Sequence, residues 1–281
     1  MEVFKEIKPL KAYLNDQRLQ GNSVGLVPTM GALHQGHISL IQASKLQNQI
    51  TICSIYVNPA QFNNPDDLLK YPRTLEKDNE LLKQIGCDAV FCPDNNEMYP
   101  EPSIINIDFG SLGTVMEGKF RPGHFSGVAL VLSKFFHIIK PDHAYFGQKD
   151  WQQFAIVQKL VDELMFDLTL HRVETLREKD GLAMSSRNQR LNAVEREKAV
   201  VFYQSLIMAK GALQAGYEIK DVIEIITKDF NRQGVRLEYF EVVDSKNLNV
   251  LNSVKGGVNQ PIMCIAGYVG EVRLIDNMFL D

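Results

Sequence analysis

The sequence predicts an α/β protein in which a doubly wound parallel sheet is followed by a smaller α+β domain. Short apolar segments of strand length alternate with segments of helical periodicity through most of the chain. The segment at residues 50–57 is apolar on both faces, which is typical of a central parallel strand. After Leu176 the order changes to long helices followed by strands, as in small α+β domains. We therefore expect two domains, residues 1–176 and residues 177–281.

The elements of the first domain follow from apolar periodicity and from residues that cap or end helices. Thr74 is expected to cap a helix that Gly86 ends, and Ser126 to cap an apolar helix that ends before Pro141. In chain order we expect a helix at 8–20, a strand at 24–28, a helix at 37–47, strands at 50–57 and 88–92 around a helix at 75–85, a strand at 104–109, a helix at 128–139, a strand at 143–146, a helix at 150–164 and a strand at 168–176. Repeated right-handed strand–helix–strand units of this kind place ligands outside the carboxyl ends of the strands.

The second domain begins with a charged loop, Arg177 to Asn192. Long helices are expected near residues 193–214 and 218–232, and strands near 235–243, 261–268 and 271–276. Consecutive strands joined by short connections favour antiparallel pairing, so this part should form the smaller α+β domain.

The composition narrows the class of protein. A net charge of −4 with scattered Lys and Arg argues against a nucleic-acid interface, which normally shows a basic patch. The four cysteines form no Cys-x-x-Cys pair, and three of them lie within apolar runs where a reduced core thiol is expected, which fits a cytoplasmic protein. The N-terminus lacks the features of a secretory signal, and the longest apolar stretch, Val128 to Ile139, is too short to span a bilayer. We expect a soluble, cytoplasmic protein without a membrane partner.

The strongest candidate site is a glycine-bearing turn between the first strand and the following helix. His34 and His37 lie at the start of that helix, and Gly31 and Gly36 allow a sharp turn and close approach of a ligand. Amide N–H groups at a helix N-terminus favour an anion, usually phosphate. Surface histidines and a zinc site are the alternatives, although catalytic zinc usually has three protein ligands. The context favours the phosphates of ATP.

Two further loops carry groups that suit a polyphosphate. Lys149 lies at the expected carboxyl end of a strand, where it could bind phosphate as a point charge or remain a solvated loop residue. The loop that contains Ser185, Ser186 and Arg187 offers hydroxyl and guanidinium donors, or it could be a simple linker.

Neutral amide side chains provide a candidate site for a small hydroxy acid. Asn58 and Gln61 follow the second strand, and Gln153 lies on the helix after Lys149. Gln61 and Gln153 could face each other across the ligand crevice of the sheet, or Asn58 and Gln61 could simply cap the end of the strand.

Four motifs together resemble one family. They are Pro28-Thr29-Met30-Gly31-Ala32-Leu33-His34-Gln35-Gly36-His37, Asn58-Pro59-Ala60-Gln61-Phe62, Phe146-Gly147-Gln148-Lys149-Asp150 and Asp180-Gly181-Leu182-Ala183-Met184-Ser185-Ser186-Arg187-Asn188. Their order and spacing resemble pantothenate synthetases (pantoate–β-alanine ligases) over nearly the whole chain. That family belongs to the nucleotidylyltransferase superfamily, so the resemblance implies a Rossmann-like first domain, with the second domain acting as a lid over the active site.

The resemblance also implies a reaction and a set of site residues. ATP and (R)-pantoate would give pantoyl adenylate and pyrophosphate, and β-alanine would then give pantothenate and AMP. His34, His37, Lys149 and Arg187 would be catalytic. The ATP site would contain Met30, Gly31, Ala32, Leu33, His34, Gln35, Gly36, His37, Gly147, Gln148, Lys149, Asp150, Leu176, Met184, Ser185, Ser186 and Arg187. Gln61 and Gln153 would bind pantoate, with Gln61 also reaching the β-alanine region. Mg²⁺ would accompany ATP, and the protein would be a homodimer.

Other functions remain possible at this point. Another nucleotidylyltransferase could join a nucleotide to a phosphorylated acceptor, and a non-catalytic sensor could bind an adenine nucleotide. Gln35 and Gln148 occupy positions where the family often has Glu, and Leu176 replaces a common Val. Asp78, Arg121 and His124 lie in stretches that also resemble the family, without an assigned role.

Overall fold

The computed structural model describes residues 1–254 and 260–280. It contains two compact units. The first combines Met1–Gly147 with Ile156–Glu174, and the second combines Gln148–Ala155 with the described part of the chain from Thr175 onward.

The first unit is built on a parallel sheet of six strands in the order β1-β4-β3-β2-β5-β6. Every pairing between neighbouring strands of this sheet is parallel. The strands are β1 (Glu2–Phe4), β2 (Val24–Thr29), β3 (Ile50–Ile55), β4 (Ala89–Phe91), β5 (His143–Gly147) and β6 (Thr169–Val173). The chain runs outward from β2 through β3 to β4 and then returns to β5 on the other side of β2. This confirms the doubly wound sheet and places its topological switch point between β2 and β5, where such folds bind ligands.

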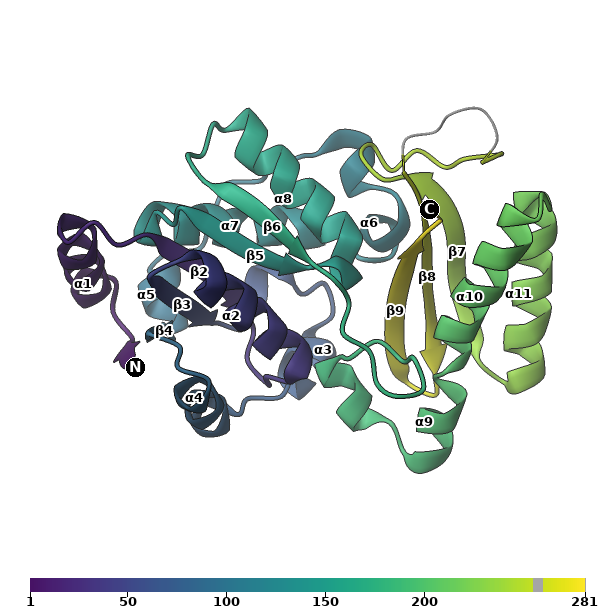
Figure 1. Cartoon of the computed structure of the whole chain (residues 1–281), viewed down its shortest axis with the longest axis horizontal. Coiled ribbons are helices and arrows are strands. Elements are labelled where there is room, and N and C mark those ends of the chain that lie inside the picture. The colour runs from purple at the N-terminus through teal and green to yellow at the C-terminus, as the bar shows by residue number, and fades with distance from the viewer. Residues whose placement is uncertain (255–259, 281) are drawn as a thin grey trace. The chain divides into compact units, whose positions relative to one another are not determined.

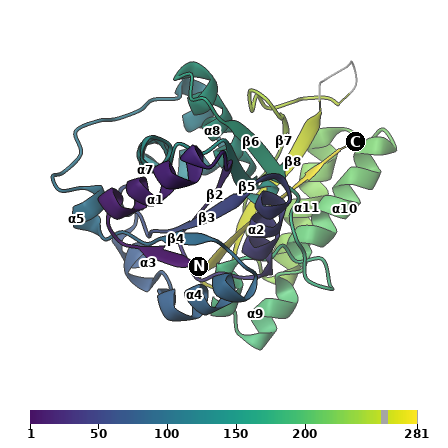
Figure 2. The same ribbon diagram turned by 60° about the vertical axis from the view of Figure 1, so that its left-hand side comes forward.

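Helices cover both faces of this sheet (Figures 1 and 2). The helices of this unit are α1 (Ile7–Leu19), α2 (Gln35–Gln47), α3 (Pro65–Lys70), α4 (Leu75–Gln84), α5 (Asn95–Met98), α6 (Met116–Phe120), α7 (His124–Ile139) and α8 (Trp151–Glu163), the last of which is shared between the units. Helices α2 and α4 pack on one face, where Leu40, Ile41 and Leu82 contact Val27 and Val90 of the sheet. On the other face, α7 places Phe135 against Phe91, with ring centroids 6.1 Å apart.

All four cysteines are free and buried, which confirms the prediction of core thiols. Burial raises the pKa of Cys53 well above its ordinary value and that of Cys87 to about 11, so both are protonated at neutral pH.

Three local predictions were wrong. Residues 104–109 form no strand, because no neighbouring strand pairs with them; the Ile107 N–H instead donates to Ser126 Oγ at 3.0 Å. Ser126 lies inside α7, which begins after Gly123, and its hydroxyl donates to Asn106. Thr74 precedes α4 as expected, but its hydroxyl donates to Asp78 at 3.1 Å and caps no helix amide.

The second unit has an antiparallel sheet of three strands in the order β7-β8-β9. The strands are β7 (Arg236–Asp244), β8 (Pro261–Val269) and β9 (Val272–Phe279), and the helices are α9 (Ala193–Lys198), α10 (Val201–Gln214) and α11 (Ile219–Gln233). Figure 1 shows α10 and α11 side by side against this sheet, and the rings of Phe202 and Phe230 meet between them at 5.1 Å. The predicted α+β order is confirmed, although the expected helix at 193–214 is divided into α9 and α10. Among the described residues, no helix is both long and apolar enough to cross a membrane.

Candidate active site

The turn after β2 holds an internal carboxylate. Gly31 and Ala32 have φ values of 80° and 49°, so successive amides converge toward one point, as in the anion-binding arrangement known as a nest. Asp78, on α4 and only 3% exposed, fills that point: its carboxylate accepts the N–H of Ala32 at 3.0 Å and that of Leu33 at 2.8 Å. Glycine suits position 31 because L side chains rarely adopt its φ of 80°, and an added Cβ would lie 3.0 Å from the same carboxylate. Asp78 therefore fixes the conformation of the turn that precedes His34.

His34 and His37 cap the start of α2 reciprocally. The Gly36 N–H donates to His34 Nδ1 at 3.1 Å, and the His34 N–H donates to His37 Nδ1 at 3.3 Å. Because an amide N–H can only donate, each Nδ1 carries no proton, and each neutral ring has its proton on Nε2. The ring centroids are 4.1 Å apart. The two side chains that sequence reasoning singled out are thus held as a reciprocal pair at the start of α2.

This geometry changes which groups of the turn are expected to bind phosphate. The N–H groups of Ala32, Leu33 and Gly36, which sequence reasoning left open to an anion, already have acceptors within the protein. The imidazole side chains of His34 and His37 are therefore the groups of this turn that best suit an incoming phosphate.

A second cluster in the same unit links Gln61 to Met30. Gln61 is 7% exposed; its Nε2 donates to Met30 Sδ at 3.2 Å, and its Oε1 accepts a hydrogen bond from Asn58 Nδ2 at 3.1 Å. Asn58 also donates to the Gly127 carbonyl at 3.1 Å and accepts from the Tyr99 hydroxyl at 3.0 Å. The structure therefore brings together a residue predicted for ATP, Met30, and one predicted for pantoate, Gln61.

Helix α7 packs against the backbone of Gln61. His124, 6% exposed, places Nδ1 2.8 Å from the Gln61 carbonyl, and this nitrogen must donate because a carbonyl oxygen only accepts. At Gly127 the helix approaches the backbone of the turn: an added Cβ would lie 2.2 Å from the Ala60 carbonyl oxygen and 2.7 Å from the Gln61 amide nitrogen. The hydrogen bond to the Gln61 carbonyl gives His124 a structural role. Arg121 forms an ion pair with Glu117 at 3.9 Å.

We expect Gly127→Ala to lower the free energy of unfolding by about 1–3 kcal/mol, because the methyl group must displace backbone atoms. The displaced Gln61 should also raise the KM for pantoate. The control is Gly211→Ala, since an added Cβ at Gly211 in α10 meets nothing within 4 Å; there, alanine should stabilise the helix by up to about 1 kcal/mol. Denaturant unfolding and steady-state kinetics measure both effects. An unchanged KM in a destabilised Gly127→Ala protein would show that the packing does not position Gln61.

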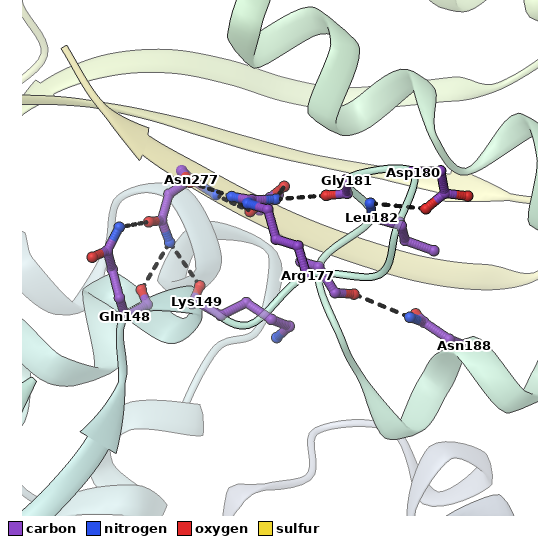
Figure 3. A network of polar contacts seen from close by, with 10 residues as sticks. Gln148, Lys149, Arg177, Asp180, Gly181, Leu182, Asn188 and Asn277 are labelled. Atoms are coloured by element: carbon purple, nitrogen blue, oxygen red, sulfur yellow. Dashed lines mark hydrogen bonds and ion pairs between the residues drawn. The ribbon is translucent and has the colours of Figure 1, made fainter. Parts of the chain in front are cut away.

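In the second unit, the turn that carries Lys149 is attached to the C-terminal strand. The short 3₁₀ helix η3 (Gln148–Asp150) places Lys149 Nζ 3.3 Å from Asp150 Oδ1. Asn277 of β9 donates to the carbonyls of Gln148 and Lys149 at 2.9 and 2.8 Å (Figure 3). The position of Lys149 thus depends on a residue far away in the sequence.

The loop after Thr175 forms a tight hairpin that joins two further residues predicted for ATP. The Met184 N–H donates to the Leu176 carbonyl at 3.0 Å, and Arg177 inside the hairpin forms a bidentate ion pair with Asp276 at 2.6 and 3.0 Å. Ser185 Oγ accepts the Arg187 N–H at 3.3 Å and so caps the 3₁₀ helix η4 (Ser186–Arg190). Ser186 is 8% exposed.

Sequence reasoning missed Arg177, Asp276 and Asn277. The available signal was the polar pair Asp276-Asn277 inside an otherwise apolar strand segment, because buried polar residues need specific partners.

Gln61 and Gln153 lie in different units, so their expected opposition across the crevice stays a prediction. In residues 1–254 and 260–280, no group of three or more His, Cys, Asp or Glu side chains could hold a metal ion.

A doubly wound sheet with a histidine-bearing turn after β2, next to the switch point, is typical of nucleotide-binding α/β proteins. The chain belongs to the family of pantoate–β-alanine ligases, which are ATP-dependent ligases, since the model of that family matches residues 2–279. The resemblance inferred from the four motifs is thereby confirmed.

Individual relatives agree with this family. The pantothenate synthetase of Bacteroides fragilis strain YCH46 is 45% identical over 279 residues, which cover 99% of this chain and 98% of the relative. The crystal structure of pantothenate synthetase from Thermus thermophilus superimposes with a TM-score of 0.92 at 36% identity, covering 100% of this chain and 99% of that one. The pantoate–β-alanine ligase of Francisella tularensis, solved in complex with "Beta-gamma ATP" and β-alanine, gives a TM-score of 0.84 at 34% identity, covering 100% and 98%.

Proposed function

We propose that this chain condenses (R)-pantoate with β-alanine to pantothenate, at the expense of ATP and through pantoyl adenylate. The observation that carries the proposal is the reciprocally capped His34/His37 pair next to the switch point, in a chain of this family. Two rings with fixed Nε2–H donors suit a polyphosphate, and the Gln61–Met30 contact places a neutral amide in the same unit.

In the first step, a carboxylate oxygen of pantoate attacks the α-phosphorus of ATP. The new O–P bond forms as the bond from the α-phosphorus to the bridging oxygen breaks, and pyrophosphate leaves. The protein must position two anions and stabilise the charge that builds on the phosphate oxygens. His34, His37, Lys149 and Arg187 supply donors and cations for this task, and the remaining ATP contacts come from the segments Met30–His37, Gly147–Asp150 and Leu176 with Met184–Arg187.

In the second step, the neutral amine of β-alanine attacks the acyl carbon of the adenylate. The C–N bond forms, AMP leaves with the electrons of the broken C–O bond, and the amine loses a proton. Gln61 and Gln153 bind pantoate through amide hydrogen bonds, and Gln61 also reaches the β-alanine region.

A coupled assay tests the function directly. AMP should form only when ATP, pantoate and β-alanine are all present, while pyrophosphate should be released with ATP and pantoate alone. Pyrophosphate release with a phosphorylated acceptor in place of pantoate would indicate another nucleotidylyltransferase. ATP binding without AMP formation under any of these conditions would indicate a nucleotide sensor.

We further propose that residues 177–281 act as a lid over the active site formed with residues 1–176, because the acyl adenylate must be shielded from water. The loop Arg177 to Asn192 should then become more resistant to limited proteolysis when ATP and pantoate are added together. Equal cleavage of that loop with and without the two substrates would contradict closure.

The family resemblance also supports a cytoplasmic homodimer that uses Mg²⁺. Mg²⁺ usually binds through phosphate oxygens and one or two carboxylates, so it would accompany ATP. A dimer would offer cover for Ile104 and Ile105, which are 97% and 63% exposed in a segment whose sequence suits a strand. Sedimentation of the purified protein, compared with an Ile104→Lys variant, tests this assembly: the variant should sediment as a monomer.

A further inference from the structure

Two adjacent residues near the end of β9 carry polar groups into the interior of the second unit. Asp276 and Asn277 are 4% and 2% exposed. Since successive side chains of a strand point to opposite faces, the side chains of Asp276 and Asn277 lie on opposite faces of the sheet. Leu274, two residues earlier, belongs to the apolar core of the unit. A buried polar pair at this position needs partners, and it finds them in the two loops already described.

Asn277 holds the turn that carries Lys149. Its Nδ2 donates to both the Gln148 and Lys149 carbonyls, at 2.9 and 2.8 Å, and its Oδ1 lies 3.4 Å from Gln148 Nε2. On the same face of β9, the ring of Phe279 meets that of Trp151 edge to face at 5.0 Å. The turn is thus attached to β9 by hydrogen bonds and by packing.

Asp276 holds the other loop through Arg177. The guanidinium that pairs with Asp276 also donates to the Gly181 carbonyl at 3.0 Å and to the Asn277 carbonyl at 3.3 Å. Arg177 and Gly181 both lie within the hairpin that the Leu176–Met184 hydrogen bond closes. Figure 3 shows the continuous network from Gln148 through Asn277 and Arg177 to Gly181.

We propose that Asn277 is a positioning residue for Lys149, and that Asp276, through Arg177, positions the hairpin that leads to Ser185 and Arg187. The inference rests on the proposed function, in which both loops contact ATP. One strand then sets the relative position of two phosphate-binding loops. A displacement of about 1 Å at a reacting centre can lower a rate by about a hundredfold, so such support has a kinetic consequence.

The test uses the full chain with Asn277→Ala, which removes both donors, and Asn277→Ser, which retains one donor and preserves folding if the alanine protein unfolds. Leu274→Ala is the control for the Lys149 turn, because it removes apolar core from the same strand on the face opposite to Asn277. Asn277→Ala should lower the kcat of pantoate-dependent pyrophosphate release by about tenfold, with the KM for pantoate unchanged. Asn277→Ser should fall between Asn277→Ala and the unsubstituted protein, and folded Leu274→Ala should keep its kcat.

A double-mutant cycle separates positioning from a general structural role. In a Lys149→Ala background, Asn277→Ala should change kcat by less than about twofold, because the group through which it acts is gone. An equal loss in both backgrounds, or an unchanged kcat in folded Asn277→Ala, would overturn the inference. Full activity of Lys149→Ala alone would instead overturn the proposed role of Lys149. Amide hydrogen exchange at residues 148–150 then tests separately whether Asn277 positions the Lys149 turn. The exchange rate should rise in Asn277→Ala and not in Leu274→Ala.

Discussion

Replacing His37 with alanine should lower the rate of pantoate-dependent pyrophosphate release by about a hundredfold, or roughly 3 kcal/mol of transition-state stabilisation. The expected loss reflects removal of one Nε2–H donor from the charge that develops on the phosphate oxygens. His37 also accepts the His34 N–H, so the variant should lose about 0.5–2 kcal/mol of stability as well.

A second substitution separates these two effects. His37→Glu keeps a side-chain acceptor for the His34 amide, as glutamate does at the same position of a capping box, but its ionised carboxylate donates no hydrogen bond. It should therefore restore stability and leave activity low. His137→Ala, at an exposed position of α7, is the matched control and should retain full activity. Recovery of activity in His37→Glu would mean that His37 serves the helix cap and not the phosphate.

Replacing Lys149 with alanine should have an effect of similar size, about a hundredfold on pyrophosphate release, with little change in stability. The side chains of Lys149 and its ion-pair partner Asp150 are 16% and 48% exposed, so the pair is partly open to solvent and should contribute only about 1 kcal/mol to stability. Because arginine presents a planar fork where lysine presents a compact charge, Lys149→Arg should not restore the rate fully.

The control for Lys149 is Lys159→Ala on α8, which removes a lysine whose ion pair with Glu163 is exposed. It should leave both kinetics and unfolding unchanged. Pyrophosphate release at the unsubstituted rate in Lys149→Ala would exclude Lys149 from the adenylation step. Equal losses in the two lysine variants would point to net charge as the cause.

Much of this molecule could be predicted from local patterns. Apolar segments such as residues 50–57 require burial on both faces, and that requirement alone indicated β3 and a parallel sheet. The histidine pair was recognisable because its position between a strand and a helix is a local feature. The edge strand β1 was not predicted, since three residues with exposed or half-buried side chains carry no periodic signal and pair only because β4 is beside them.

The sequence by itself determined most of the order of strands and helices, the switch from α/β to α+β near Leu176, and the residue types suited to ATP. Only the tertiary structure decided how those residues are held. Asp78 occupies the nest at Ala32 and Leu33 across 46 and 45 residues of chain, and Asn277 holds the Gln148 and Lys149 carbonyls across 129 and 128. The physical reason is that buried polar groups must find partners wherever the fold brings them, and neither periodicity nor capping rules extend over such separations.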